Sequence, residues 1–125
     1  MSHANASGQI VAMLTNVRVE ACAVGVEGTN RTRTGIKKSV FMNNPTGLRL
    51  SGTDNVMNVD DVFVSYATTG LRSSAGNTIR VSDSVITQNA TGVDTNGGTI
   101  TSLSGNSVEG NTVDGSFTGA AVPKS

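Results

Sequence analysis

The sequence has few ring-bearing, thiol or imidazole side chains. In 125 residues there is no tryptophan, and there are one tyrosine, three phenylalanines, one cysteine and one histidine. A single cysteine cannot form an internal disulfide, so a disulfide framework is excluded. The scarcity of aromatic side chains also removes the stacking platforms on which single-stranded nucleic acids bind.

Charge is sparse and balanced as well. Nine basic residues offset nine acidic ones, and only 14% of the residues are charged. This excludes a basic nucleic-acid surface and a polybasic membrane-binding surface, and the sequence contains no P-loop. No apolar run approaches the roughly 20 residues that span a bilayer. We therefore expect no nucleic acid, no membrane and no cofactor as partners.

The start of the chain, Met1–Gly8, lacks the basic and apolar regions of a secretory signal peptide. This leaves the compartment open. Valine, isoleucine and leucine are frequent and the net charge is zero. That combination indicates a folded chain rather than a disordered one.

What the sequence does contain is a repeat. A glycine followed by an aliphatic residue recurs at spacings of 22, 23 and 22, in Gly25-Val26, Gly47-Leu48, Gly70-Leu71 and Gly92-Val93. Apolar residues alternate within short stretches such as Thr78–Ser82, which is the two-residue period of a half-buried strand. One repeat cannot bury its own apolar face, but stacked repeats can. The sequence predicts an all-β parallel solenoid of about five rungs, a rung being one full turn of 22 to 23 residues. We expect a single domain over residues 1–125, with rungs over about 10–117.

The repeat also resembles a known family. Ile79-Arg-Val-Ser-Asp83-Ser84, followed by Ile86, Asn89 and Gly92-Val93, is similar to the parallel β-helix repeat of pectin-lyase-like proteins. The resemblance implies a right-handed coil and relatives that are mostly secreted or on the cell surface. It is specific for the fold and not for activity, because that superfamily holds lyases, hydrolases and adhesins.

Residues at equivalent places in each rung should form columns along the rod. A valine column predicts one buried stack, and the repeated glycines predict sharp turns at positive φ. The threonines and asparagines predict an outward hydroxyl ladder, favoured over an ice-binding face, and an amide ladder that bonds the turn backbone. The valines are Val17, Val40, Val62, Val85 and Val108, the threonines Thr46, Thr69 and Thr91, and the asparagines Asn44, Asn89 and Asn111. Cys22 shares the asparagine column and is predicted to be buried or half-buried.

A charged column follows two residues after each glycine: Glu27, Arg49, Arg72 and Asp94. One interpretation is two exposed ion pairs, Glu27 with Arg49 and Asp94 with Arg72. The other is a carbohydrate-binding clamp, in which the two arginines hold a uronate or sulfate group. We favour the ion pairs, because each arginine has a carboxylate one rung away.

No motif predicts catalysis or a metal site. Asp60, Asp61 and Asp83 fall at one turn on adjacent rungs, where they predict either a calcium site or a solvated turn, and we favour the turn. Repeat lengths differ by one residue, so no insertion builds the walls of a groove. We therefore expect no catalytic residue and no turnover of pectin-type polymers. We place a bulge at Tyr66 and a turn or a poorly paired edge at residues 27–35.

The last prediction is self-association. In each rung the residue after the inward valine should point outward, which gives Arg18, Phe41, Phe63, Ile86 and Glu109. Phe41, Phe63 and Ile86 would then form an apolar oligomer interface rimmed by charge, unless a local turn places the phenylalanines in the core. Neither end carries an amphipathic cap, so we expect another molecule or further rungs to cover the ends.

The leading hypothesis is thus a non-catalytic structural or interaction module that forms a homo-oligomer. The alternative, which the resemblance implies, is a carbohydrate-binding or polysaccharide-degrading protein with a polysaccharide as partner.

Overall fold

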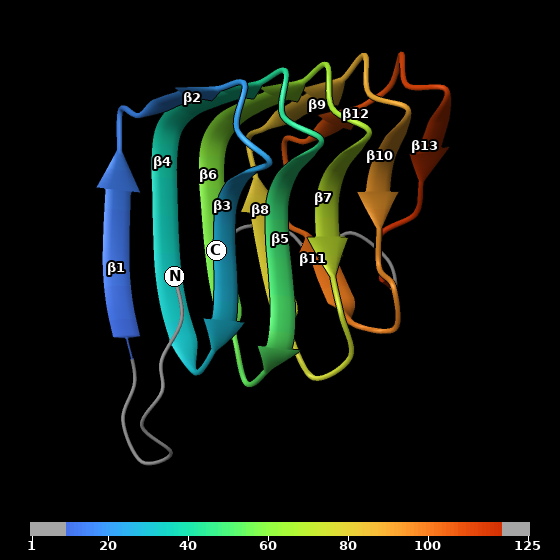
Figure 1. The fold of residues 1–125 in the computed structure, drawn as a ribbon. Coiled ribbons are helices and arrows are strands. Elements are labelled where there is room, and N and C mark those ends of the chain that lie inside the picture. Colours follow the sequence, from blue (N-terminus) through green and yellow to red (C-terminus); the bar gives the residue numbers. More distant parts are fainter. Residues whose placement is uncertain (1–9, 119–125) are drawn as a thin grey trace.

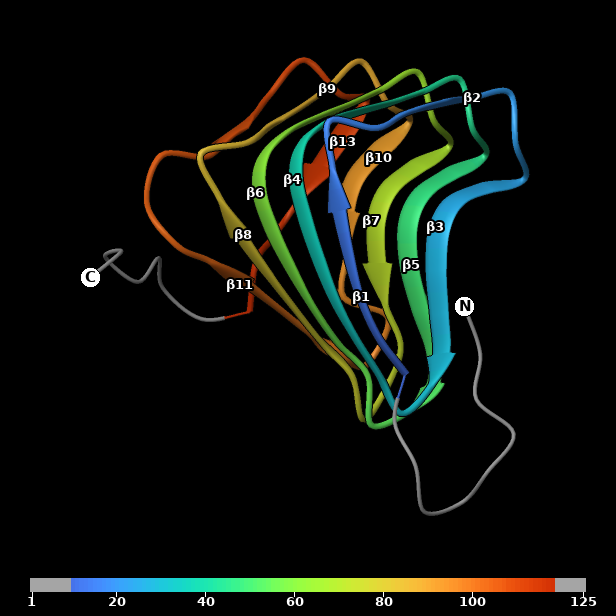
Figure 2. The same ribbon diagram turned by 90° about the vertical axis from the view of Figure 1, so that its left-hand side faces the viewer.

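The computed structural model describes residues 10–118 and shows a rod of about five stacked rungs built from β-strands (Figure 1). Figure 2 looks along the rod from the β1 end. From that side the chain runs clockwise through β1, β2 and β3 while later rungs lie behind, so the solenoid is right-handed. The predicted fold class is confirmed. Between Ile10 and Thr118 no helix is long and apolar enough to cross a membrane.

The strands form two sheets whose paired strands are all parallel. Sheet A has the strand order β1-β4-β6-β8-β11, with β2, β9 and β12 paired beside this path. Its strands are β1 (Ile10–Thr15), β2 (Arg18–Glu20), β4 (Thr32–Met42), β6 (Val56–Ser65), β8 (Thr78–Ser82), β9 (Val85–Thr87), β11 (Thr99–Ser102) and β12 (Ser107–Val108). Sheet B has the order β13-β10-β7-β5-β3. Its strands are β3 (Val24–Asn30), β5 (Thr46–Thr53), β7 (Thr69–Ser73), β10 (Thr91–Asp94) and β13 (Val113–Gly115).

The hydrophobic core fills the space between the two sheets. Each rung contributes side chains from both, and the largest have no exposed surface: Ile36, Phe41, Leu48, Leu50, Met57, Leu71, Ile79, Ile86 and Ile100. On the first rung, Leu14, Val19 and Val26 are only half-buried against this core, because no described rung lies beyond them. At the other end Phe117 packs on the core, and Thr118 exchanges two hydrogen bonds with the backbone of Ile100.

Each rung turns its corners through residues in the left-handed region. Most of these residues are not glycine, and their φ angles lie between 43° and 60°. Three columns recur from rung to rung: Asn16, Lys38, Asp61, Asp83 and Gly105; Ala21, Asn43, Tyr66, Gln88 and Gly110; and Arg31, Asp54 and Gly76. A left-handed residue that carries a Cβ costs about 1 kcal/mol, so something must stabilise the corners.

Ladders of hydrogen bonds supply that stabilisation. The side chain that follows a corner residue accepts a hydrogen bond from the backbone N–H at the same place in the preceding rung. Asn44 accepts from Cys22 at 2.8 Å, and Asn89 accepts from Ala67 at 2.9 Å. Asn111 accepts from the N–H of Asn89 at 2.9 Å, which confirms the predicted amide ladder.

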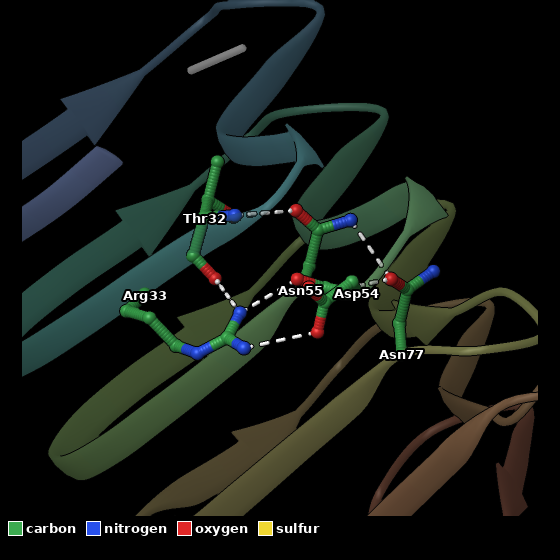
Figure 3. Close-up of polar contacts among 5 residues, drawn as sticks. All are labelled: Thr32, Arg33, Asp54, Asn55 and Asn77. Carbon is green, nitrogen blue, oxygen red and sulfur yellow. Dashed lines mark hydrogen bonds and ion pairs between the residues drawn. The ribbon is translucent and has the colours of Figure 1, made fainter. Parts of the chain in front are cut away.

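Two further ladders occupy the other corners. Asn55 Oδ1 accepts from the N–H of Thr32, and Asn77 Oδ1 accepts from the N–H of Asn55, both at 3.0 Å (Figure 3). At the remaining corner, Ser39 Oγ accepts from the N–H of Val17 and Ser84 Oγ accepts from the N–H of Val62, both at 3.1 Å. Asn106 Oδ1 in turn accepts from the N–H of Ser84 at 3.0 Å. The sequence analysis missed both ladders, although Asn55 and Asn77 stand one repeat apart.

The predicted valine stack is wrong. Val40 pairs with Phe63 and not with Val62, and Phe63 pairs with Val85, which is 39% exposed. The inward column instead contains Val19, Phe41, Val64, Ile86 and Val108, so only Val108 of the predicted valines belongs to it. Only Val62 of the five predicted valines is fully buried, because equivalent corners are spaced 22, 23, 22 and 22 residues apart and the valines are not.

Other local predictions are corrected too. The repeated glycines have no positive φ; a Cβ on Gly25 or Gly70 would instead stand 2.4 or 2.6 Å from the backbone oxygen of the next rung's glycine. Tyr66 is an ordinary corner residue and not a bulge. Residues 27–35 belong to β3 and β4, so they are strands, but the predicted turn is present at Arg31 and β3 is an edge strand whose register shifts between Gly28 and Asn30. Cys22 is exposed, since it lies on the first rung.

Candidate functional site

The charged column predicted from the sequence lies on the outer face of sheet B. Glu27 pairs in register with Arg49, Arg49 with Arg72, and Arg72 with Asp94. The Nε of Arg49 donates to Glu27 Oε2 at 2.5 Å, and Ser51 Oγ donates to the same oxygen at 3.2 Å. The Nε of Arg72 lies 3.7 Å from Asp94 Oδ2. Both predicted ion pairs are present.

These contacts leave little basis for an arginine clamp. Each guanidinium already binds a carboxylate, and a uronate or sulfate would have to displace it. The side chains keep between 25% and 40% of their surface exposed, so the pairs lie in largely solvated surroundings. Such pairs contribute roughly 0.2 to 1 kcal/mol to stability. The charged column therefore consists of two separate ion pairs on the surface.

Replacing Arg49 or Arg72 with glutamine should lower the free energy of unfolding by no more than about 1 kcal/mol, with the larger loss at Arg49, whose contact is shorter. Urea unfolding at low salt and at 1 M salt measures this, because high salt screens exposed pairs. Arg80→Gln is the matched control, since Arg80 is exposed and forms no ion pair within residues 10–118. A loss well above 2 kcal/mol that is insensitive to salt would contradict the surface-pair interpretation.

The acidic turn does not gather into a cation site. Asp61 and Asp83 are exposed corner residues, and Asp60 accepts a hydrogen bond from Ser82 Oγ at 2.9 Å. Within the described part of the chain, no group of three or more His, Cys, Asp or Glu side chains is suited to a metal ion. The favoured prediction of a solvated turn agrees with this placement.

The outward ladder of Phe41, Phe63 and Ile86 does not exist. Phe41 and Ile86 are completely buried in the core, and only Phe63 is half-exposed. The rejected valine alignment is the cause, because it placed Phe41 one residue after an inward position. The alternative, that Phe41 packs in the core, is therefore correct, whereas Phe63 faces outward.

The row that does point outward contains Val40, Phe63 and Val85. Backbone pairing joins Val40 to Phe63 and Phe63 to Val85, so these side chains follow one another at single-rung intervals of about 4.8 Å. Arg18 and Ser107 occupy the same row at its two ends. The corner residues Lys38, Asp61 and Asp83 run beside it, and a shallow hollow of about 430 Å³ lies between row and corner. We call Val40, Phe63 and Val85 the outer apolar row.

Fold and surface together define the class of this protein as a parallel β-solenoid. No protein-family model matches the chain, and no match was found among curated proteins or among experimentally solved structures. The resemblance to pectin-lyase-like proteins therefore rests on the repeat pattern alone.

Proposed function

We propose that the protein is a non-catalytic interaction module that forms a homodimer through the outer apolar row. The observation that carries the proposal is the row itself: three large apolar side chains on successive rungs, facing solvent, with charges along one side. Apolar patches bordered by charge mark association surfaces more often than chance exposure does.

The order of charges along the row supports a second copy as the occupant. Lys38, Asp61 and Asp83 occupy the same corner on the second, third and fourth rungs. A two-fold axis along the strands of the third rung would bring Lys38 opposite Asp83 of the second copy, and Val40 opposite its Val85. Phe63 would meet its own counterpart at the centre. Such an isologous contact forms the Lys38–Asp83 pair twice, and these two pairs flank the one like-charge contact, between Asp61 and its own counterpart.

The test is the oligomeric state of the full chain by sedimentation equilibrium. We expect a concentration-dependent dimer for the unchanged chain, and dimerisation weakened on the order of thirtyfold or more by Phe63→Asp, since a central aromatic is the usual hot spot. Tyr66→Asp is the matched control. Tyr66 is 55% exposed and lies outside the row, so its replacement should leave the dimer intact.

Charge reversal checks the orientation of the two copies. Lys38→Asp should weaken the dimer by placing two acidic groups together, and adding Asp83→Lys should restore it. Sedimentation of the unchanged chain as a monomer up to high micromolar concentration would refute self-association. If the double variant Lys38→Asp with Asp83→Lys does not dimerise, while Phe63→Asp is monomeric as expected, only the proposed two-fold arrangement of Lys38 opposite Asp83 would be refuted. Self-association through the outer apolar row would stand.

A further inference from the structure

A second hollow lies on the outer face of sheet A, on columns away from the outer apolar row. It encloses about 310 Å³, and Gly35 is among the residues that line it. Met13 pairs with Gly35, and Gly35 with Asn58, so the glycine interrupts an outward column of larger side chains. A Cβ on Gly35 would stand 2.7 and 2.8 Å from Cε and Sδ of Met13. The absent side chain thus creates this Gly35 hollow, and Met13 lies against it.

The hollow has an apolar wall. Val11 is 76% exposed and Met13 is 65% exposed, although both are apolar, and Leu103 lines the opposite side. No aromatic residue is among the lining residues. Water in contact with this surface would be released if a hydrocarbon group covered it.

The rim of the hollow is cationic. Arg33, Lys37 and Arg80 line it together with one acidic residue, Asp60. Arg33 is engaged, because it donates to Asp54 Oδ1 at 2.9 Å and to the Asp54 carbonyl at 2.6 Å (Figure 3). Lys37 and Arg80 are both exposed, and neither forms an ion pair within residues 10–118. Two cations are therefore available beside an apolar wall.

We propose that the Gly35 hollow binds a small amphiphilic anion. Its unbranched hydrocarbon tail would lie along Val11 and Met13, and its carboxylate or sulfate would be held by Lys37 and Arg80. The volume is at the lower end of the range of roughly 300 to 1,000 Å³ that small-molecule sites occupy. Charge-assisted hydrogen bonds from two cations orient such a head group. This inference does not rest on self-association, since the two surfaces share no residue.

Methionine methyl resonances give a direct test on the full chain. With ¹³C-methyl methionine labelling, decanoate below its micelle concentration should shift the Met13 methyl signal saturably. Met57, which is fully buried in the core, provides an internal reference that should barely move. Lys37→Gln with Arg80→Gln should weaken binding about tenfold, whereas Lys38→Gln, at a neighbouring corner outside the hollow, should not. Gly35→Ala should weaken binding by filling the hollow.

Comparison ligands distinguish the proposed occupant from others. Acetate tests the head group alone, decyl maltoside the tail alone, and trigalacturonate an acidic sugar. The proposal requires decanoate and decyl sulfate to bind more tightly than all three. Equal affinity for decyl maltoside would overturn the role of the cations, and tighter binding of trigalacturonate would overturn the choice of an amphiphile. No saturable shift of Met13 with any ligand would overturn the site.

Discussion

Replacing Asn55 with alanine is expected to lower the free energy of unfolding by about 3 kcal/mol. Asn55 is 1% exposed, and its Oδ1 accepts from both the N–H and the Oγ1 of Thr32, at 3.0 and 2.7 Å. Its Nδ2 donates to the Ser51 carbonyl at 2.7 Å and to Asn77 Oδ1 at 2.8 Å. Alanine removes all four bonds and leaves the buried N–H of Thr32 without this acceptor, which is the costly part.

Chemical unfolding measures this loss, with Asn58→Ala as the matched control. Asn58 lies three residues later, on β6, but is exposed, and its replacement should change stability by less than about 0.5 kcal/mol. Asn55→Asp refines the test because it keeps the acceptor for Thr32 and removes the two donated bonds. A loss below 1 kcal/mol for Asn55→Ala would show that the ladder contributes little to holding the rungs together.

Gly70→Ala should be at least as damaging, with an expected loss of about 3 kcal/mol or more. A Cβ at this position would stand 2.6 Å from the backbone oxygen of Gly92 and 3.0 Å from Cγ2 of Ile86. The first contact is with backbone of the adjacent rung, so no side-chain rotation relieves it. Two rungs would have to move apart, against a spacing of about 4.8 Å that their hydrogen bonds fix.

The control for Gly70 is Gly97→Ala. Gly97 has a φ of +87°, but a Cβ there would make only ordinary van der Waals contacts, with Ala75 atoms no closer than 3.7 Å. Its replacement therefore costs only backbone strain, about 1 kcal/mol, whereas Gly70→Ala adds a steric clash. Thermal unfolding of the two variants separates these causes. Equal losses would mean that the glycine column is not required by close approach of the chain.

One physical reason explains why the charged column was predicted correctly from the sequence and the valine column was not. The column of Glu27, Arg49, Arg72 and Asp94 was aligned correctly because it was counted from the glycines, and these glycines occupy one geometric place in the first four rungs. A constraint that only one residue type satisfies is visible in a sequence. The fold class followed from the same recurrence, since parallel stacking needs only the period.

The valine series misled because valine tolerates both faces of a strand. Val62 points inward and Val85 outward, and either position suits a β-branched side chain. The residues that mark equivalent places in successive rungs are the left-handed corner residues, which are as different as Lys38, Tyr66 and Ala21. Because backbone geometry and not residue type defines them, Phe41 was assigned to the wrong face. The Gly35 hollow escaped detection for a related reason: it depends on which face that glycine occupies.

The corner ladders have a direction that bears on how the protein is made. In all eight ladder bonds described above, the acceptor follows the donor by 22 or 23 residues. During translation, the corner amides of a newly made rung therefore stay hydrated until the ribosome has added the next rung. At about 5 to 20 residues per second, that wait is roughly one to four seconds. The nascent rod thus matures from its N-terminal end, always one rung behind the growing chain.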